Sequence, residues 1–546
     1  KPQSILIDTG GKEQRMMRET RRGVLVALLL MAVLALVSAP ATAQDDGMTE
    51  FVFAHTGPIR TMDAPVTWFG STHWLTNLLY ECLIWRSLDG SGYVGQAAAS
   101  WEATDDTTWR FNLRPGITFH NGEPLDAEAV KWNIDRVRTR EDFMVHPQWL
   151  FVNDVIVIDD VTVDVTTHQP HPYFEYDVSF NGCQLLPPDY MAEVGEEEFA
   201  RNPVGSGPYM LTEFSESDRY QFDAWDDYWG GRPEVDRVIY QVIPEQAAQV
   251  AALLAGQVDL ISGVPPADRE QLEAAEGISL VSEAGGRMQH LLARIDLEAG
   301  IMPEAYPDYQ PVTLDPRVRY AISHALDREL LAEVHGAASA RLGRVCAHFP
   351  EGGADSFNSP EAVAANYDPE RARELLAEAG YPDGGVKIYL DSPTADARGG
   401  SEKEVAEVIS VMLEEVGFDV ELNILDPSAY REQVQTSGGH RDLMLINQGC
   451  APSLVPLFYQ CNWPSNLARV CNEEWDEVSN EILRTIDFDA RMALWDQWWE
   501  FMFELGMQMT LYEIQAVYAY DSENFTFEPR RDGWMTFRGN IGLADG

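Results

Sequence analysis

Lysine is nearly absent from this chain: beyond residue 43 it occurs only as Lys131, Lys387 and Lys403. Lysine and arginine together number 39 against 88 aspartates and glutamates, which gives a formal net charge of −49 at pH 7. A field of that sign repels nucleic acid and anionic lipid, so we expect no nucleic-acid partner. Because salt screens the self-repulsion of such a surface, the composition also predicts a halophilic protein from a salty habitat.

Long apolar runs are scarce as well. The main one, Gly23–Ser38, covers 16 residues, whereas a membrane span usually needs about 20. Arginines precede this run, and small residues that suit signal peptidase end at Ala43. The pattern predicts that residues 1–43 are an upstream extension followed by a cleaved secretory signal, with the export route, Sec or Tat, left open. We therefore expect a soluble mature protein in the periplasm.

Cysteine is sparse, and its spacing excludes the usual zinc motifs. The six cysteines include no C-x-x-C pair, and an oxidising compartment favours disulfides. Cys461 and Cys471 are the strongest candidates because they would close a short loop. Cys346 with Cys450 is a weaker pairing that the sequence leaves open. The cysteines are Cys82, Cys183, Cys346, Cys450, Cys461 and Cys471.

Catalytic signatures are also missing. The sequence contains no H-E-x-x-H, no G-x-S-x-G and no Walker loop. His168 and His171 flank Pro170, which prevents them from sharing one helical face. We therefore predict a protein that is not an enzyme and needs no cofactor. A secreted hydrolase is kept as a disfavoured alternative.

The residues present indicate a folded α/β protein. Hydrophobic residues make up 45% of the chain and tryptophan occurs 15 times, which argues against disorder. Short β-type runs alternate with amphipathic helices along the whole chain. Examples are a strand over Val238–Ile243, a helix over Glu245–Gly256 and one long helix over Pro316–His335.

Three sets of motifs, taken together, resemble solute-binding protein family 5, the dipeptide- and oligopeptide-binding receptors of ABC importers. The first set combines Ala99-Ser100-Trp101-Glu102, Trp109–Gly116 and Phe119–Leu125. The second combines Asn202–Tyr209 with Asp227–Pro233, and the third combines Asp315–Arg319 with Ala325–Arg328. The matches occur in family order over most of residues 44–546. Glycines such as Gly205 and Gly207 also have a plain structural explanation, because backbones pass closely there.

The resemblance implies an α/β, two-lobed periplasmic-binding-protein fold (type II, cluster C) with an extra subdomain inserted in lobe one. Two strands would cross between the lobes near Arg287–Ile295 and Thr510–Tyr518, and a small solute would bind in the cleft between them. The implied partner is an inner-membrane ABC permease with its ATPase subunits, served by a monomer. The implied boundaries are 44–80, 205–287 and 512–546 for lobe one, 81–204 for the inserted subdomain and 288–511 for lobe two.

The resemblance also bears on the ligand. Peptide binders of this family hold the ligand's α-ammonium with an aspartate just after the strand equivalent to Leu443–Asn447. Here Ala451 stands at that place, and an unpaired ammonium in a closed cleft is costly to bury. The sequence thus gives no support for a dipeptide with a free N-terminus unless another acid reaches the site, and it makes an oligosaccharide or a modified peptide more plausible. A receptor for a nickel or other metal chelate is the alternative.

Several further residues are predicted to contact the ligand. Trp68 and Trp74 flank a loop that the family places at the cleft, although core packing explains them equally well. Gln289 and His290 lie on a predicted crossing strand, and a satisfied interlobe hydrogen bond is an open alternative for His290. The full set is Trp68, Thr72, Trp74, Gln289, His290, Asn447, Gln448, Ala451 and Trp463.

Overall fold

The computed structural model describes the chain from residue 47 to residue 544, with gaps. The described residues are 47–59, 61–67, 70–215, 218–295, 309–337, 366–394, 402–436, 439–449, 452–461, 463, 466, 470–530 and 536–544. The predicted signal, Trp68, Ala451, Cys346 and Cys450 lie outside them. The chain divides into a unit Lys1–Met48 and a unit Thr49–Gly546. The helices and strands of the described residues belong to the second unit, which is described by itself.

A ten-stranded mixed sheet organises this unit, in the order β14-β13-β15-β12-β16-β11-β1-β10-β9-β8. What we call the first half of the sheet comprises β11 (Leu260–Ser262), β1 (Glu50–His55), β10 (Arg237–Val242), β9 (Arg219–Ala224) and β8 (Tyr209–Ser215). The second half comprises β15 (Leu443–Gly449), β13 (Val386–Pro393) and β14 (Phe418–Leu425).

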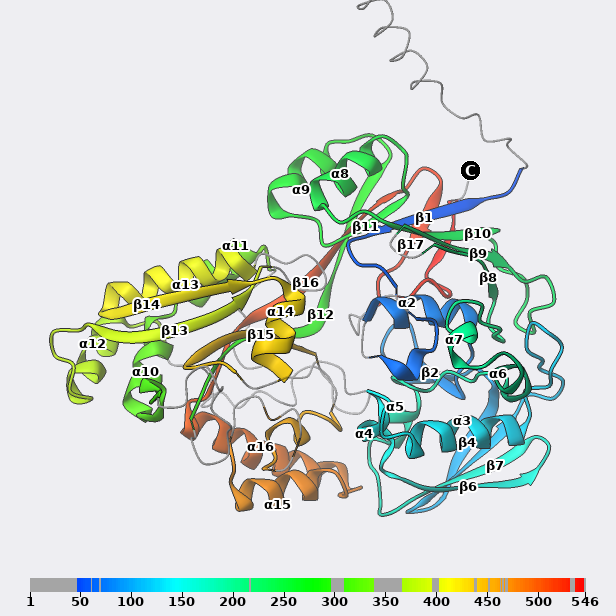
Figure 1. Ribbon diagram of the computed structural model, residues 1–546, viewed down its shortest axis with the longest axis horizontal. Helices are drawn as coiled ribbons and strands as arrows, with labels where there is room; N and C mark the ends of the chain where they lie inside the picture. Colours follow the sequence, from blue (N-terminus) through cyan, green and yellow to red (C-terminus); the bar gives the residue numbers. More distant parts are fainter. Residues whose placement is uncertain are drawn as a thin grey trace, which may run out of the picture. The chain divides into compact units, whose positions relative to one another are not determined.

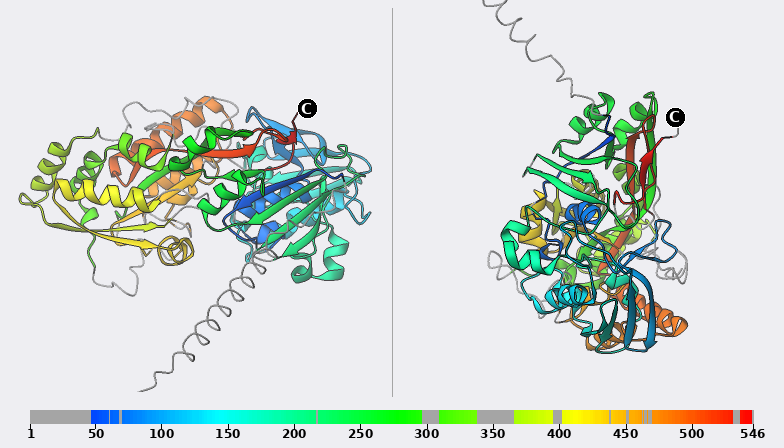
Figure 2. Two further views of the ribbon diagram at one scale, coloured as in Figure 1. Left: turned by 90° about the horizontal axis from the view of Figure 1, so that it is seen from above. Right: turned by 90° about the vertical axis from the view of Figure 1, so that its right-hand side faces the viewer.

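Two long antiparallel strands join the halves. These crossing strands are β12 (Ile278–Ala293) and β16 (Gln508–Asp521). The two strands pair with each other. At one end β16 also pairs with β11, and at the other end β12 also pairs with β15 (Figures 1 and 2). Their register shifts between Ala284 and Arg287 and again between Gln289 and His290. Such bulges bend a strand and re-aim its side chains, so the junction of the halves is locally irregular.

A separate four-stranded antiparallel sheet follows β3 in the chain. It runs β4-β5-β7-β6, with β4 at Ala98–Asp105, β5 at Thr108–Leu113, β7 at Thr162–Thr167 and β6 at Val152–Asp159. It has a hydrophobic core of its own, which includes Phe111, Val130 and Val163. Two small hairpins pair β2 (Ile84–Arg86) with β3 (Tyr93–Gly95) and β17 (Phe525–Phe527) with β18 (Ile541–Leu543).

Helices cover these sheets. Those of the first half and the four-stranded sheet are α2 (Gly70–Leu79), α3 (Ala127–Thr139), α4 (His146–Trp149), α5 (Phe174–Val178), α6 (Pro188–Val194), α7 (Glu196–Phe199), α8 (Gln246–Leu254) and α9 (Pro266–Glu273). Those of the second half are α10 (Pro316–Ala325), α11 (Arg328–His335), α12 (Pro369–Glu378), α13 (Glu402–Val416), α14 (Pro427–Tyr430), α15 (Glu473–Ile482) and α16 (Phe488–Leu505). One hydrophobic cluster packs α10 to α13 against the second half. Another packs α15 and α16 on Leu292 and Met444.

The long helix expected over Pro316–His335 is wrong, because the structure breaks it in two. The side chain of Asp327 accepts a hydrogen bond from the backbone N–H of Leu330 at 3.1 Å and so starts α11. Asp315 starts α10 in the same way, with Pro316 at its first position. Gly336 ends α11 in the left-handed conformation, with φ 76°.

Residues of the family motifs stabilise the fold through buried hydrogen bonds. The buried carboxylate of Glu81 accepts hydrogen bonds from the Tyr228 hydroxyl (2.8 Å), the Trp229 indole N–H (3.0 Å) and the Arg538 guanidinium (2.8 Å). This network joins three distant stretches of chain, and its removal would leave buried charges unpaired.

The glycines of the second motif set allow a close approach. A Cβ added at Gly205 would meet the carbonyl oxygen of Leu79 at 1.9 Å, and one at Gly207 would meet that of Leu78 at 2.4 Å. His120 ties the first motif set to the same place. Its Nδ1 accepts from the Gly205 N–H at 3.2 Å and its Nε2 donates to the Gly207 carbonyl at 3.0 Å.

Candidate functional site

Polar side chains collect where β12 passes between β15 and β16. Gln289 of β12 lies opposite Asn447 of β15 and Tyr512 of β16, whereas His290 lies opposite Ile446 and Thr510. Because successive residues of a strand point to opposite faces, Gln289 and His290 lie on opposite faces of the sheet. We call these the glutamine face and the histidine face.

On the histidine face the polar groups are paired. His290 is fully buried, and its Nδ1 lies 3.2 Å from Thr510 Oγ1 and 3.1 Å from Gln508 Nε2. Burial lowers the pKa of His290 to about 3, so the ring is neutral at physiological pH. Thr510 and Gln508 both lie on β16, and with the expected bounds all three residues belong to lobe two, so these hydrogen bonds are not the interlobe bond that the sequence left open for His290.

On the glutamine face one amide is unpaired. Gln289 is 0% exposed, yet among the described residues neither its Nε2 nor its Oε1 has a hydrogen-bond partner. Buried side-chain amides in native proteins are nearly always hydrogen-bonded, and an unmet donor or acceptor destabilises the fold by about 1–3 kcal/mol. The buried amides of Gln148 and Asn540 are unpaired in the same way, but of these three residues Gln289 is the one on a crossing strand.

Neutral amides also line the end of β15. The Asn447 side chain accepts a hydrogen bond from the Arg287 guanidinium. The Tyr459 hydroxyl donates to the Gln448 amide oxygen at 3.2 Å and also contacts Gln508. Gln289, His290, Asn447 and Gln448, predicted from the sequence, are thus brought together on neighbouring strands.

The other predicted residues have no contact with this group among the described residues. Thr72 and Trp74 are buried in α2, and Trp74 packs edge-on against His55 at 4.8 Å within the core of the first half. That is the core packing that the sequence left open for Trp74, although the Trp74 indole N–H has no hydrogen-bond partner in the described part of the chain. Trp463 is half-buried, and its backbone N–H donates to the Gln460 carbonyl.

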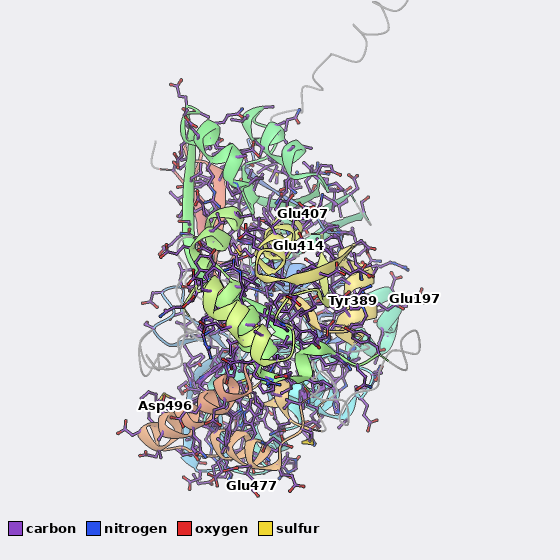
Figure 3. All side chains as sticks on the ribbon, turned by 90° about the vertical axis from the view of Figure 1, so that its left-hand side faces the viewer. Glu197, Tyr389, Glu407, Glu414, Glu477 and Asp496 are labelled. Atoms are coloured by element: carbon purple, nitrogen blue, oxygen red, sulfur yellow. A yellow bond between two sulfur atoms is a disulfide. The ribbon has the colours of Figure 1, made fainter. Side chains whose placement is uncertain are left out.

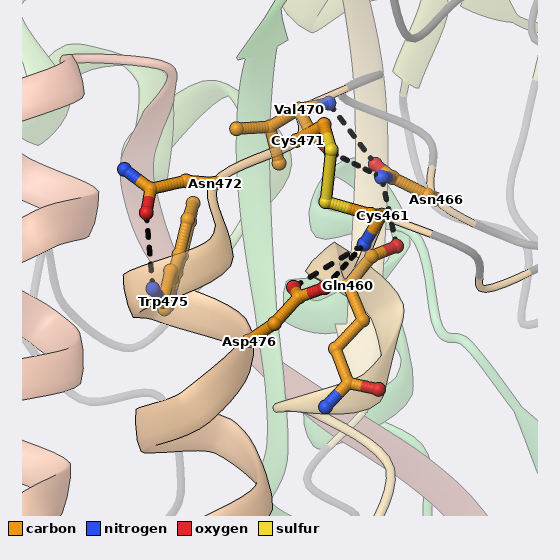
Figure 4. Close-up of a disulfide and its surroundings, with 8 residues drawn as sticks. All are labelled: Gln460, Cys461, Asn466, Val470, Cys471, Asn472, Trp475 and Asp476. Atoms are coloured by element: carbon orange, nitrogen blue, oxygen red, sulfur yellow. Dashed lines mark hydrogen bonds between the residues drawn. A yellow bond between two sulfur atoms is a disulfide. The ribbon is translucent and has the colours of Figure 1, made fainter.

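A disulfide holds the loop beside Trp463. It joins Cys461 to Cys471, the pair singled out from the sequence, with an S–S distance of 2.12 Å (Figure 4). The Asn466 side chain donates to the carbonyls of Gln460 (3.0 Å) and Val470 (2.6 Å), which braces the loop from inside. The backbone N–H of Cys461 bonds the carboxylate of Asp476 on α15.

Sequence reasoning missed several residues of this region. The missed residues that contact the predicted ones are Arg287, Tyr459, Gln508 and Thr510. Arg287, Gln508 and Thr510 lie on β12 and β16, and the alternation of side chains along these strands was a signal that could have found them. A second disulfide, Cys82–Cys183, spans 101 residues. A pairing at that separation leaves no local mark in a sequence.

Asp442, just before β15, is structural. Its carboxylate accepts hydrogen bonds from the backbone N–H groups of Tyr389 (2.9 Å) and Val312 (3.0 Å) and from the Tyr309 hydroxyl. Burial raises the pKa of Asp442 to about 6 despite these donors. The residue anchors three segments of the second half.

The acidic residues are dispersed over the exposed surface. Glu197, Glu407, Glu414, Glu477 and Asp496 are exposed and belong to four different helices (Figure 3). Such an arrangement is a solvated acidic surface and no single binding site. Within the described residues, no helix is both long and apolar enough to cross a membrane.

The fold and the junction together define a solute-binding protein of the periplasmic-binding-protein type. The model for bacterial extracellular solute-binding proteins, family 5, matches residues 92–461. The chain belongs to this family, as the motifs indicated, and it is a solute-binding receptor of an ABC importer.

Individual relatives agree with this assignment. A glutathione-binding protein of Pectobacterium atrosepticum is 24% identical over 72% of this chain and 74% of its own length. The dipeptide-binding protein of Escherichia coli is 22% identical over 86% and 90%. The solved dipeptide-binding protein of Pseudoalteromonas sp. SM9913, in complex with Met-Leu, superposes with a TM-score of 0.77 at 19% identity, covering 90% of this chain and 100% of that one. This likeness confirms the predicted fold class.

Proposed function

We propose that this chain is a periplasmic receptor that captures a peptide-like or oligosaccharide solute between two lobes and delivers it to an inner-membrane ABC permease. In this proposal the lobes and the inserted subdomain keep the bounds expected from the sequence, and β12 and β16 serve as the hinge strands. The signal-like segment before Ala43 supports export. The receptor acts by binding alone, as a monomer and without a cofactor.

The unpaired amide of Gln289 is the observation that supports a site at the junction. An amide offers one acceptor and two donors in one plane, which suits a peptide bond or a pair of sugar hydroxyls. A solute seated at the glutamine face would supply the hydrogen bonds that the protein itself leaves unmade. Its binding energy would then offset a cost already present in the folded chain.

The charges near this face argue against a ligand ammonium there. Arg287 is bonded to Asn447, and a second cation beside its guanidinium would be repelled. Asn447, which lies opposite Gln289 on this face, carries a neutral amide. With Ala451 in place of the family's aspartate, we propose a solute that presents no free ammonium at this end, such as an N-blocked peptide or an oligosaccharide.

The two alternatives, a receptor for a metal chelate and a secreted hydrolase, have less support. Within the described residues, no group of three or more His, Cys, Asp or Glu side chains is placed to hold a metal ion. A metal chelate brings its own donor atoms, so elemental analysis of the purified protein is the appropriate control. A serine hydrolase with a Ser-His-Asp triad would need a histidine between nucleophile and acid, whereas Asp177 stands between Ser453 and His171.

Thermal-shift titration of the ligand-stripped protein tests the proposed ligand class. Acetylated dipeptides, the same dipeptides with free N-termini, and cello- and xylo-oligosaccharides are compared at equal concentration. A solute at 100 times its Kd stabilises the folded state by about 2.7 kcal/mol. We expect stabilisation by an acetylated peptide or an oligosaccharide. Stabilisation by the free dipeptides alone would contradict the proposal.

A further inference from the structure

Asp177, in α5, makes a contact that reaches across 276 residues of chain. Its carboxylate accepts a hydrogen bond from the Ser453 hydroxyl at 2.5 Å and contacts Nε2 of His171 at 2.7 Å. All three side chains are buried. Hydrogen bonds to an ionised carboxylate are roughly twice as strong as neutral ones, so this small cluster is a firm connection between distant segments.

Aromatic packing extends the same connection. The Trp495 indole N–H donates to the Tyr173 hydroxyl at 2.9 Å, and the guanidinium of Arg491 lies 5.3 Å from the centre of the Tyr173 ring. Tyr173, Tyr176 and Phe180, from around α5, share a hydrophobic cluster with Leu454, Val455 and Trp495. The contact of Asp177 with Ser453 is therefore part of a packed interface.

The α5 side of this interface is held in place by contacts that do not involve Ser453. His171 stacks on Phe151 with ring centroids 4.3 Å apart and an angle of 10° between the planes. Cys183, six residues after Asp177, is bonded to Cys82. The Asp177 carboxylate is thus fixed by a stacked histidine and a disulfide-anchored chain, and little entropy is lost when Ser453 meets it.

The Ser453 side of the interface adjoins the proposed ligand site. Ser453 follows the last residue of β15, Gly449, by four positions, and Asn447 and Gln448 at the end of that strand are candidate ligand groups. The segment 452–455 therefore connects the ligand-proximal end of β15 to α5, which belongs to the expected inserted subdomain.

Resting on the proposed two-lobe function, we propose that Asp177 is a positioning residue for solute capture. Through Ser453 it holds the segment 452–455 against α5 when the lobes are closed. Closure is then stabilised by a protein–protein contact in addition to the ligand. Without this contact the closed form is less populated, and by mass action the apparent affinity for any solute falls by the same factor.

Small-angle X-ray scattering of the mature chain tests this, both as purified and after the bound solute has been stripped by denaturation and refolding. The variants are Ser453→Ala, Asp177→Ala, their combination, and Ser453→Thr, which keeps the hydroxyl. Ser479→Ala is the matched control, because the Ser479 hydroxyl oxygen accepts from the Trp498 indole N–H at 2.9 Å within the α15–α16 pair. Unfolding midpoints verify that every variant folds.

We expect Ser453→Ala and Asp177→Ala to shift the closed-to-open ratio roughly tenfold or more toward the open form. The double variant should go no further, Ser453→Thr should scatter like the wild type, and Ser479→Ala should lower stability without opening. The proposal is overturned if the Ser453 and Asp177 variants scatter like the wild type in both preparations. It is also overturned if their effects add, or if the wild type is open in both. These outcomes concern shape alone, so they are distinct from a failure to find the proposed ligand class.

Discussion

The two faces of β12 treat adjacent polar residues in opposite ways. His290 is buried and bonded to both Thr510 and Gln508, and it lies against the aromatic cluster of α15 and α16. Gln289, its neighbour in the chain, is equally buried, and among the described residues its amide has no hydrogen-bond partner. The difference indicates that the protein alone satisfies His290, whereas Gln289 is left for a solute to satisfy.

A general physical reason connects this contrast to function. A binding site must present polar groups to a ligand, and the fold leaves such groups without hydrogen bonds of their own. Sites of this kind lower stability, and substitutions that relieve them raise stability while removing function. The two faces can therefore be told apart by mutating each and measuring stability and binding together.

The largest effect is expected for Gln289→Met. Methionine has a similar shape and no amide, so the variant should gain about 1–3 kcal/mol in unfolding free energy and lose solute binding. Urea unfolding and the thermal-shift titration described above measure the two effects. Gln249→Met is the matched control, because the buried Gln249 amide donates to the Ile243 carbonyl at 2.7 Å. That variant should be less stable than the wild type, and equal losses at both positions would remove the contrast.

His290→Asn should have an effect on stability that depends on pH. The folded-state pKa of His290 is lowered to about 3, against about 6.5 for a free histidine. Its contribution to stability is therefore complete above pH 6.5 and is lost toward pH 3, by about 1.4 kcal/mol per pH unit. Asparagine does not titrate, so the stability advantage of the wild type over the variant should shrink as the pH falls from 6.5 to 4.5. A difference independent of pH would show that His290 is not buried as a neutral ring.

Salt should produce the smallest difference between the faces. The acidic surface predicts that the wild type, Gln289→Met and His290→Asn all gain stability between low and high salt, because salt screens the repulsion among exposed carboxylates. Both faces are buried, so the gain in unfolding free energy between low and high salt should differ among the three proteins by no more than about 0.5 kcal/mol. Melting curves across a salt series measure this. A wild type that keeps its full melting temperature in low-salt buffer would contradict the predicted halophilic surface.

Patterns local in sequence carried most of the prediction. The motif sets identified the family, and the short loop between Cys461 and Cys471 identified their disulfide. The break between α10 and α11 was missed although Asp327 is a typical helix-capping residue, since the apolar periodicity continues through it. For Trp74 the sequence could not choose between core and cleft, because aromatic residues serve both.

Contacts between distant segments could not be predicted. Ser453 and Asp177 are 276 residues apart, and Cys82 and Cys183 are 101 apart. Neither pair has a characteristic spacing, and each depends on how whole elements pack. The unpaired amide of Gln289 was likewise invisible, because the sequence gives a residue's type and strand position but not whether its partners are present.

The most direct test of the central claim is mass spectrometry of the solute released on denaturing the natively purified wild type and its Gln289→Met variant. The account predicts that the wild type carries an organic solute without a free ammonium and that the variant carries none. A dipeptide with a free N-terminus from the wild type, or an equal load of solute in both proteins, would contradict it.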